Sequence, residues 1–227
     1  MAVELSNLFS LKGKVIVITG ASGLLGRKHA EAVAACGGNP VLLDVSQEIV
    51  DEQASNLNRQ YPINAVGFEV DITKELQVKT NAEFILKKFG KIDGLVNNAA
   101  NNPKVESNSE KNFSRLENFP LDMWNQDIAV GLTGAFLCAK HYGYGITQNP
   151  SGGVIINISS DLGLIAPDQR LYSNSDLNAK DQSVKPVTYS VAKTGLLGLT
   201  RYLATYWLDE NVRCNAICPG GVENGQP

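Results

Sequence analysis

Short apolar runs alternate with helical patterns along the whole chain. The apolar runs cover residues 15–18, 40–43, 65–70, 92–96, 154–158 and 212–217. Helical patterns separate them over about residues 23–36, 47–60, 74–89, 121–144 and 188–208. Continuous apolar runs of this length are typical of strands buried on both faces of a parallel sheet. The pattern therefore predicts a doubly wound α/β fold.

Two polar segments, residues 101–120 and 168–186, interrupt this alternation. Both are rich in turn-forming side chains, and both follow predicted strands at their carboxyl ends. Ligands of open α/β sheets bind in the crevice outside those ends. We expect the two segments to form walls of a substrate pocket, with ordinary surface loops as the alternative.

Length and composition point to one globular domain spanning residues 1–227. Hydrophobic residues make up 43% of the chain and charged residues 19%, and no apolar run approaches the ~20 residues of a membrane-spanning helix. The first residues lack the pattern of a signal peptide. These observations predict a soluble, cytoplasmic protein that does not bind membranes.

Charge and cysteine placement argue against two further classes. The net charge is -3 and the basic residues are scattered, so no nucleic acid partner is expected. Cys214 and Cys218 would lie roughly 13 Å apart in an extended strand, beyond disulfide reach. No Cys, His and Asp cluster has metal-ligand spacing, so we expect buried free thiols and no metal.

The first predicted strand runs into a glycine-rich turn that opens a helix. The turn comprises Thr19, Gly20, Ala21, Ser22, Gly23, Leu24, Leu25 and Gly26. Glycines allow the backbone to turn tightly and to approach a pyrophosphate, which free amide groups and the helix dipole then stabilise. The strand before the turn and the helix after it strengthen this dinucleotide-binding interpretation.

Asp44 ends the second predicted strand. A carboxylate at this place can accept hydrogen bonds from both ribose hydroxyls and would repel a 2′-phosphate. Asp44 therefore favours NAD over NADP, although such a residue could also be a turn residue that caps the next helix.

Tyr189 and Lys193 stand four residues apart in the last predicted helix. On a helix this spacing places both side chains on one face, so the ammonium can stabilise a phenolate. A tyrosine in this setting can transfer protons near neutral pH. The same spacing occurs on many solvated helices, so its meaning depends on the surrounding motifs.

Six motifs follow one another in order. They are the glycine turn, Asp71 after the third strand, Asn97-Asn98-Ala99-Ala100 after the fourth, Ser160 after the fifth, Tyr189 with Lys193, and Pro219-Gly220 after the sixth. Together they resemble the short-chain dehydrogenase/reductase family over about residues 11–222. The resemblance implies a Rossmann-type domain, a nicotinamide cofactor, hydride transfer at a carbonyl or alcohol carbon, and a homodimer or homotetramer built from two long helices.

The resemblance also implies roles for individual residues. Tyr189 is similar to the family's general acid/base, Lys193 to the group that supports it and binds the nicotinamide ribose, and Ser160 to the hydroxyl that holds the substrate oxygen. The implied cofactor-binding residues are Gly20, Ser22, Gly23, Leu24, Leu25, Gly26, Asp44, Asp71, Ile72, Asn97, Ala99, Tyr189, Lys193, Pro219, Gly220 and Val222.

The chain departs from the family pattern in four places. Gly131 stands where the family usually carries a catalytic Asn, so only a backbone carbonyl remains there. Leu24 replaces a glycine of the usual turn, and residues 168–186 enlarge the gap between Ser160 and Tyr189. The sequence ends at Pro227, before the substrate lid and last strand that the family implies.

The first hypothesis is an NAD-dependent oxidoreductase acting on a polar, sugar-like substrate, because polar loops supply hydrogen-bond partners for hydroxyl groups. Residues 162–169 and 185–189 also resemble oxidoreductases linked with bacterial surface-sugar and flagellin modification. The alternatives are an NAD-binding regulatory or scaffold protein, which Gly131 favours, and a nucleotide-sugar epimerase or dehydratase, which the glycine pattern suggests.

Overall fold

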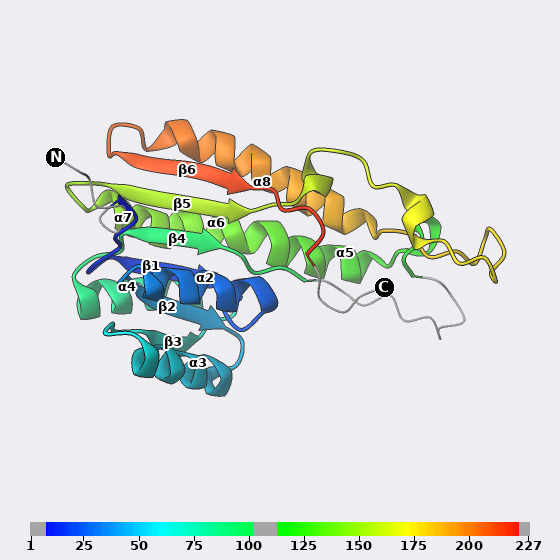
Figure 1. Ribbon diagram of the computed structural model, residues 1–227. Coiled ribbons are helices and arrows are strands. Elements are labelled where there is room, and N and C mark those ends of the chain that lie inside the picture. The colour runs from blue at the N-terminus through cyan, green and yellow to red at the C-terminus, as the bar shows by residue number, and fades with distance from the viewer. Residues whose placement is uncertain (1–7, 102–112, 223–227) are drawn as a thin grey trace.

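Six parallel strands form one sheet in the order β3-β2-β1-β4-β5-β6 (Figure 1). The computed structural model describes residues 8–101 and 113–222. The strands are β1 (Val15–Thr19), β2 (Asn39–Asp44), β3 (Val66–Glu69), β4 (Gly94–Asn97), β5 (Gly153–Ile158) and β6 (Val212–Ile217). The strand order confirms the doubly wound, Rossmann-type fold predicted from the apolar runs.

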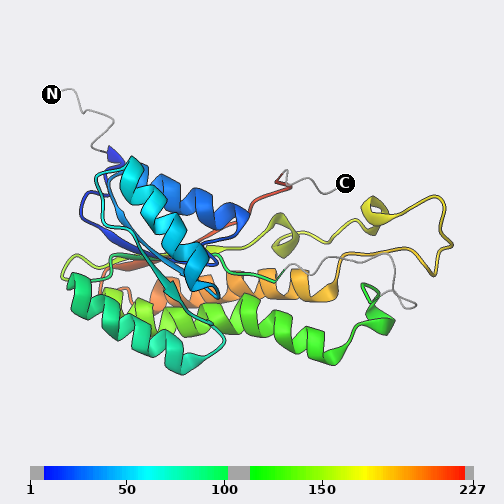
Figure 2. The same ribbon diagram turned by 90° about the horizontal axis from the view of Figure 1, so that it is seen from below.

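Helices cover the sheet from both sides (Figure 2). One side carries α2 (Leu24–Ala35) and α3 (Gln47–Gln60), and the other carries α4 (Glu75–Phe89), a long segmented helix and α8 (Val187–Tyr206). Successive side chains of a strand point to opposite faces, so adjacent residues of β1 enter different cores. Ile18 packs with the α2 and α3 side, whereas Val17 packs with α4 and the long helix.

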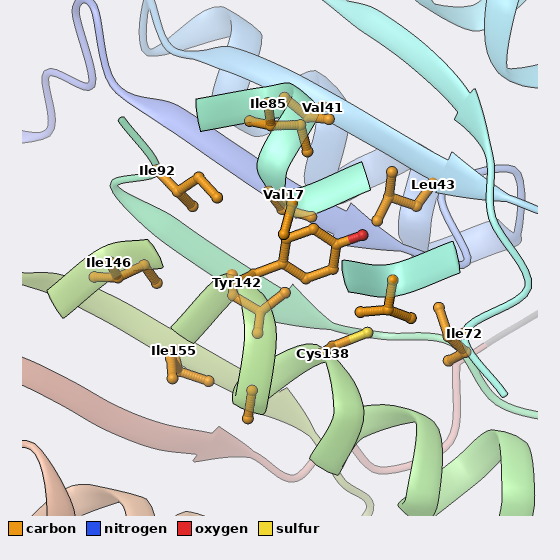
Figure 3. Close-up of a cluster of buried hydrophobic side chains, with 14 of the residues drawn as sticks. Val17, Val41, Leu43, Ile72, Ile85, Ile92, Cys138, Tyr142, Ile146 and Ile155 are labelled. Carbon is orange, nitrogen blue, oxygen red and sulfur yellow. The ribbon is translucent and has the colours of Figure 1, made fainter. Parts of the chain in front are cut away.

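Tyr142 lies at the centre of the larger core and is fully buried. Figure 3 shows its ring among Val17, Leu43, Cys138 and Ile155. Its hydroxyl donates a hydrogen bond to Asn81 Oδ1 at 3.0 Å, which satisfies the only polar atom of the side chain. Burial raises the pKa of Tyr142 well above its ordinary value, so this tyrosine stays neutral and serves packing.

The long helix differs from the uninterrupted one predicted over residues 121–144. It runs as α5 (Leu121–Ile128), α6 (Gly134–Cys138) and α7 (Tyr144–Thr147), joined by π-helical turns at Ala129–Thr133 and Ala139–Gly143. Glycines lie at these turns because the helix packs closely on its neighbours. A Cβ at Gly134 would stand 2.6 Å from Ile72 Cδ1, and one at Gly143 would stand 2.7 Å from the Trp207 ring.

The chain reverses its direction of travel across the sheet between β1 and β4. It proceeds from β1 outward to β3, and then returns to place β4 on the other side of β1. In open α/β sheets this switch point opens the crevice in which ligands bind. Sheet topology therefore places the predicted dinucleotide turn, which follows β1, next to the residues that follow β4.

The structure also bears on the predictions about cysteines and membrane-spanning helices. Cys36, Cys138, Cys214 and Cys218 are free cysteines, as expected. Cys138 and Cys214 are buried, but Cys36 and Cys218 are half-buried, so the expected burial is wrong for these two. Burial raises the pKa of the Cys214 thiol to about 11. Across residues 8–101 and 113–222, no helix is both long enough and apolar enough to cross a membrane.

Asp93 ties the amino ends of β1 and β4 together and gives a test of the fold. It is 5% exposed, accepts a hydrogen bond from the Val15 amide at 2.9 Å, and pairs with Lys14 and Lys91 at 3.0 Å each. Burial alone would raise its pKa, but these hydrogen bonds outweigh burial and hold the pKa below the ordinary value. The ionised carboxylate therefore stabilises the fold above the unfolded-state pKa of about 3.9, and this contribution is lost as the pH falls through the lower folded-state value.

We expect Asp93→Asn to lower the free energy of unfolding by about 1–3 kcal/mol at pH 7, because a neutral amide replaces a charged acceptor. Urea titrations between pH 7 and pH 3 should show this difference shrinking below about pH 4. Glu31→Gln, which removes an exposed ion pair with Lys28, is the control and should change stability by less than about 0.5 kcal/mol. A difference that stays constant with pH would contradict the role given to the Asp93 charge.

Candidate active site

A cavity of about 450 Å³ lies outside the carboxyl ends of β1 to β4. Nine of the predicted cofactor-binding residues line it: Gly20, Ser22, Gly23, Leu24, Leu25, Asp44, Asp71, Ile72 and Ala99. The volume lies within the range of ordinary small-molecule sites. The structure thus gathers residues from four strand ends into one cavity, as the fold requires of a ligand site.

The glycine turn is shaped by close backbone contacts. Gly20 has a φ of +61°, and a Cβ there would lie 2.7 Å from Ala99 Cα. Gly26 is buried in the first turn of α2, where a Cβ would lie 2.1 Å from Gly20 O. Gly23 caps the amino end of α2, so the helix begins at the cavity wall. The free amide groups of this helix end can meet a pyrophosphate.

Asn98 holds the glycine turn in place, a role that sequence reasoning missed. Its side-chain amide donates to the carbonyls of Thr19 and Gly20 at 3.0 Å each. In return, Thr19 Oγ1 accepts from the amides of Asn98 and Ala99 at 3.0 and 3.1 Å. The available signal was the second asparagine of the Asn97-Asn98-Ala99-Ala100 motif, in which only Asn97 and Ala99 were assigned to the cofactor.

Asp44 stands at the carboxyl end of β2 and faces the same cavity. Its Oδ2 accepts from the Ser22 amide at 2.9 Å and from Ser22 Oγ at 2.6 Å, while Oδ1 accepts from the Val45 amide at 2.9 Å. The helix that follows is capped by Ser46, so Asp44 is not its cap. Ser22 therefore orients the carboxylate at the edge of the cavity.

Two other predicted cofactor residues have structural bonds of their own. Asp71 Oδ1 accepts from the Thr73 amide at 2.9 Å and from Thr73 Oγ1 at 2.6 Å, and the residue lines the cavity. Asn97 is 3% exposed and does not line it. Its amide donates to Asn157 Oδ1 at 2.8 Å, so Asn97 lies beneath the site and joins β4 to β5.

Tyr189 and Lys193 lie on one face of α8, as their spacing predicted. Lys193 Nζ stands 5.7 Å from the centroid of the Tyr189 ring and donates to the Ile158 carbonyl at 2.8 Å. Burial is the main cause that lowers the pKa of Lys193, and the nearby Lys185 ammonium lowers it further. The resulting pKa is about 8. At pH 7 the charged form still predominates, so a cation stands beside the phenol.

Ser160 follows β5 and begins a short 3₁₀ turn at Asp161–Gly163. Its Oγ donates to Asp161 Oδ1 at 2.8 Å and accepts from the Leu162 amide at 3.2 Å. Two hydrogen bonds dock this turn on α8: Ser159 Oγ to the Lys193 carbonyl at 2.8 Å, and Thr194 Oγ1 to the Gly163 carbonyl at 3.1 Å. The serine turn and the Tyr189 helix are therefore held together.

Pro219, Gly220 and Val222 follow β6, as predicted, but do not line the cavity beside the glycine turn. The Pro219 carbonyl accepts from the Asp161 amide at 3.0 Å, which places this segment against the serine turn. Val222 is exposed, and the chain after it lies outside the described residues.

A small second cavity lies beside Tyr189 and Lys193. Gly131, in the first π-helical turn, forms part of its wall, and a Cβ there would stand 3.2 Å from Ala192 Cβ. Ala100 and Asn101 line both this cavity and the larger one, so the two adjoin. The cavity lined by the glycine turn and the cavity beside Tyr189 therefore share one wall.

The polar segments form a third cavity of about 440 Å³. Ser114, Arg115, Leu116 and Glu117 come from one segment, and Gln169, Val184 and Lys185 come from the other. Hydrogen bonds join the two segments, from the Val184 amide to Ser114 Oγ at 3.0 Å and from Arg115 to the Ala179 carbonyl at 3.2 Å. Residues 102–112 of the first segment lie outside the described residues.

The parallel sheet, the glycine turn at its switch point and the tyrosine and lysine pair define the class of dinucleotide-binding oxidoreductases. The family model described as short chain dehydrogenase matches residues 14–226. The chain belongs to this family, whose members use nicotinamide cofactors.

Individual relatives span most of the chain. An uncharacterized oxidoreductase of Thermotoga maritima is 34% identical over 95% of this chain and 74% of its own length. An NADP-dependent mannitol dehydrogenase of Alternaria alternata is 30% identical over 99% of this chain and 76% of its own. The crystal structure of an NAD⁺-bound xylitol dehydrogenase is similar, with a TM-score of 0.79 and 25% identity over 95% of this chain and 73% of that chain.

Gly26 offers a test of the glycine turn. We expect Gly26→Ala to weaken binding of NADH and NADPH by about tenfold or more, because a Cβ 2.1 Å from Gly20 O forces the turn to move. Fluorescence titration measures the binding. Gly198→Ala, on α8 with open space around the added carbon, is the matched control and should leave binding unchanged. Equal dissociation constants for Gly26→Ala and the parent protein would contradict the close packing described here.

Proposed function

We propose that this protein is an NAD-dependent oxidoreductase that transfers a hydride between nicotinamide and a secondary alcohol or carbonyl of a polyol or sugar-like substrate. The observation that carries the proposal is the position of Tyr189 and Lys193 beside a cavity that adjoins the glycine-lined one. A phenol, a neighbouring ammonium and a dinucleotide cavity are the groups that alcohol oxidation requires.

The residues of the chain divide the work of proton transfer and positioning. The Tyr189 phenolate takes the alcohol proton during oxidation, and the hydroxyl that results gives the proton back during reduction. The Lys193 ammonium stabilises this phenolate, and the hydrogen bond from Lys193 Nζ to the Ile158 carbonyl at 2.8 Å fixes the ammonium in place. Ser160 Oγ orients the substrate oxygen after exchanging its hydrogen bond with Asp161. A bound nicotinamide ring supplies the hydride acceptor or donor.

The preference for NAD rests on Asp44. Three hydrogen bonds from Ser22 and Val45 fix its carboxylate at the cavity edge, where a ribose hydroxyl can donate to it and a 2′-phosphate would be repelled. The NAD⁺-bound xylitol dehydrogenase supports this choice, whereas the mannitol dehydrogenase relative is NADP-dependent. Both relatives act on polyols by name, which supports a polyol or sugar-like substrate.

A homodimer or homotetramer is part of the proposal. Large apolar side chains remain exposed on the outer helices, among them Phe136 on α6 and Tyr202 and Tyr206 on α8. Tyr202 and Tyr206 stack with their ring centroids 5.2 Å apart, which gives this face a rigid aromatic surface suited to a second copy.

Gly131 favours a second candidate, a regulatory or scaffold protein that binds NAD without turnover. No side chain at this position can take part in a proton relay behind Lys193. Against this candidate stands the retention of Ser160, Tyr189 and Lys193. Turnover by the intact protein decides between the two.

We expect Tyr189→Phe to lower kcat for oxidation of xylitol, mannitol or glycerol by about 10²- to 10⁴-fold, because the general acid/base is lost. NADH absorbance measures the rate, and NAD binding should change by less than about threefold. Tyr144→Phe, which changes an exposed tyrosine of α7 that has no role in the site, is the control and should leave kcat unchanged. A rate that survives Tyr189→Phe would sink the mechanism. Tight NAD binding without turnover of any alcohol by the intact protein would favour the regulatory candidate.

We expect Asp44→Ala to raise the ratio of kcat/KM for NADP over NAD by about tenfold or more, since the mutation removes a charged hydrogen-bond acceptor for ribose and a repulsive charge. Glu52→Ala, an exposed carboxylate on the neighbouring helix α3, is the matched control for net charge. An unchanged ratio in Asp44→Ala would remove Asp44 from coenzyme selection.

A further inference from the structure

Lys185 places a second ammonium group beside the predicted general acid/base. Its Nζ lies over the Tyr189 ring, 3.9 Å from the centroid, closer than Lys193 Nζ at 5.7 Å. The Lys185 amide donates to Gln169 Oε1 at 2.8 Å, and Pro186 follows as the cap of α8, so the backbone that carries this lysine is fixed. Lys185 belongs to residues 185–189, whose resemblance to other oxidoreductases assigns no role to this lysine.

The side chain stands where two cavities meet. Lys185 lines the small cavity with Tyr189 and Lys193, and it also lines the 440 Å³ cavity between the polar segments. A substrate whose reacting carbon lies at Tyr189 would therefore extend past Lys185 into the larger space. That space has the volume of an ordinary small-molecule site.

The charges around Lys185 leave it without a close counter-ion. In the described part of the chain, no carboxylate forms an ion pair with it. Asp161 attracts it from a distance, but Asp161 Oδ1 already accepts from Ser160 Oγ and the Leu162 amide. Arg115, the other cation at the larger cavity, is paired with Glu117 at 2.5 Å.

Burial makes this arrangement of two ammonium groups unfavourable. Desolvation lowers the pKa of Lys185, and the Lys185 ammonium in turn lowers the pKa of Lys193. A half-buried cation that faces another cation is stabilised when an anion enters, because the anion replaces lost water as a partner. A ligand that carries a negative charge beyond its reacting carbon would supply such a partner.

We propose that Lys185 binds an anionic group of the substrate, so that the polyhydroxy substrate is a sugar acid or a sugar phosphate rather than a neutral polyol. This inference rests on the proposed function for the position of the reacting carbon. It narrows the substrate class, since a neutral polyol would leave Lys185 without an anionic partner.

Binding without turnover tests this inference directly. Calorimetry on the Tyr189→Phe protein loaded with NAD compares matched probes: glycerol with glycerate and glycerol 3-phosphate, xylitol with xylonate, and mannitol with mannonate. We expect at least one anionic probe to bind about tenfold or more tighter than its neutral partner. The glycerate and glycerol 3-phosphate arms separate carboxylate from phosphate.

Variants of Lys185 identify the group responsible. Adding Lys185→Met should remove this preference for the anionic probe, whereas Lys185→Arg should retain most of it. Lys180→Met, an exposed lysine of the same polar segment, is the matched control and should leave the preference unchanged. Equal binding of neutral and anionic probes, a failure of all anionic probes to bind, or a preference that survives Lys185→Met would each overturn the inference.

Turnover by the parent protein separates the two proposals. Oxidation of the preferred anionic probe supports both. Anion-selective binding that depends on Lys185, with no oxidation of any probe, would overturn the proposed oxidoreductase function and leave the Lys185 site standing. Oxidation of neutral polyols with kcat/KM values equal to those of their acids would support the oxidoreductase function and overturn the inference about Lys185.

Discussion

The hydrogen bonds between Asn98 and the Thr19–Gly20 backbone are the constraint on which the site depends. They join the carboxyl ends of β1 and β4, where the chain changes its direction across the sheet. Gly20 can then approach Ala99 without a side chain between them, and α2 begins at the cavity wall. Because parallel strands alone would leave this crevice free to vary in width, the asparagine clamp sets the space into which a dinucleotide must fit.

A second set of hydrogen bonds fixes the positions of β5 and α8 in the opposite half of the sheet. Lys193 reaches the last residue of β5 through the Ile158 carbonyl, and Ser159 holds the Lys193 backbone in return. These contacts bury a cation that would otherwise prefer water, and the strand-end carbonyl compensates for part of the lost hydration. Ser160, Tyr189 and Lys193 therefore sit on rigid elements on one side of the switch point, and the glycine turn sits on the other side.

Much of this fold and site could be predicted from the sequence, because the residues that form them follow simple periodic or local patterns. Buried parallel strands give continuous apolar runs, and the glycine turn and the Tyr189–Lys193 spacing follow from local backbone geometry. The role of Asn98 could not be predicted, because its side chain forms hydrogen bonds with the end of a strand that is distant in the sequence. The position of Lys185 beside Tyr189 could not be predicted for a similar reason. It lies in a polar segment whose contacts follow no periodic sequence pattern. The long helix packs closely against Ile72 at Gly134 and against Trp207 at Gly143, and no local sequence pattern encodes these contacts.

The two π-helical turns in the long helix have a consequence for how the site and the core can change independently. An α-helix advances about 100° per residue. The extra residue of each π turn therefore rotates the side chains of the following helix residues relative to those of the preceding ones. The face that carries Gly131 toward Tyr189 is thereby set separately from the face that buries Tyr142. Because of these turns, the cavity wall at Gly131 and the core contact at Tyr142 do not share one helical register.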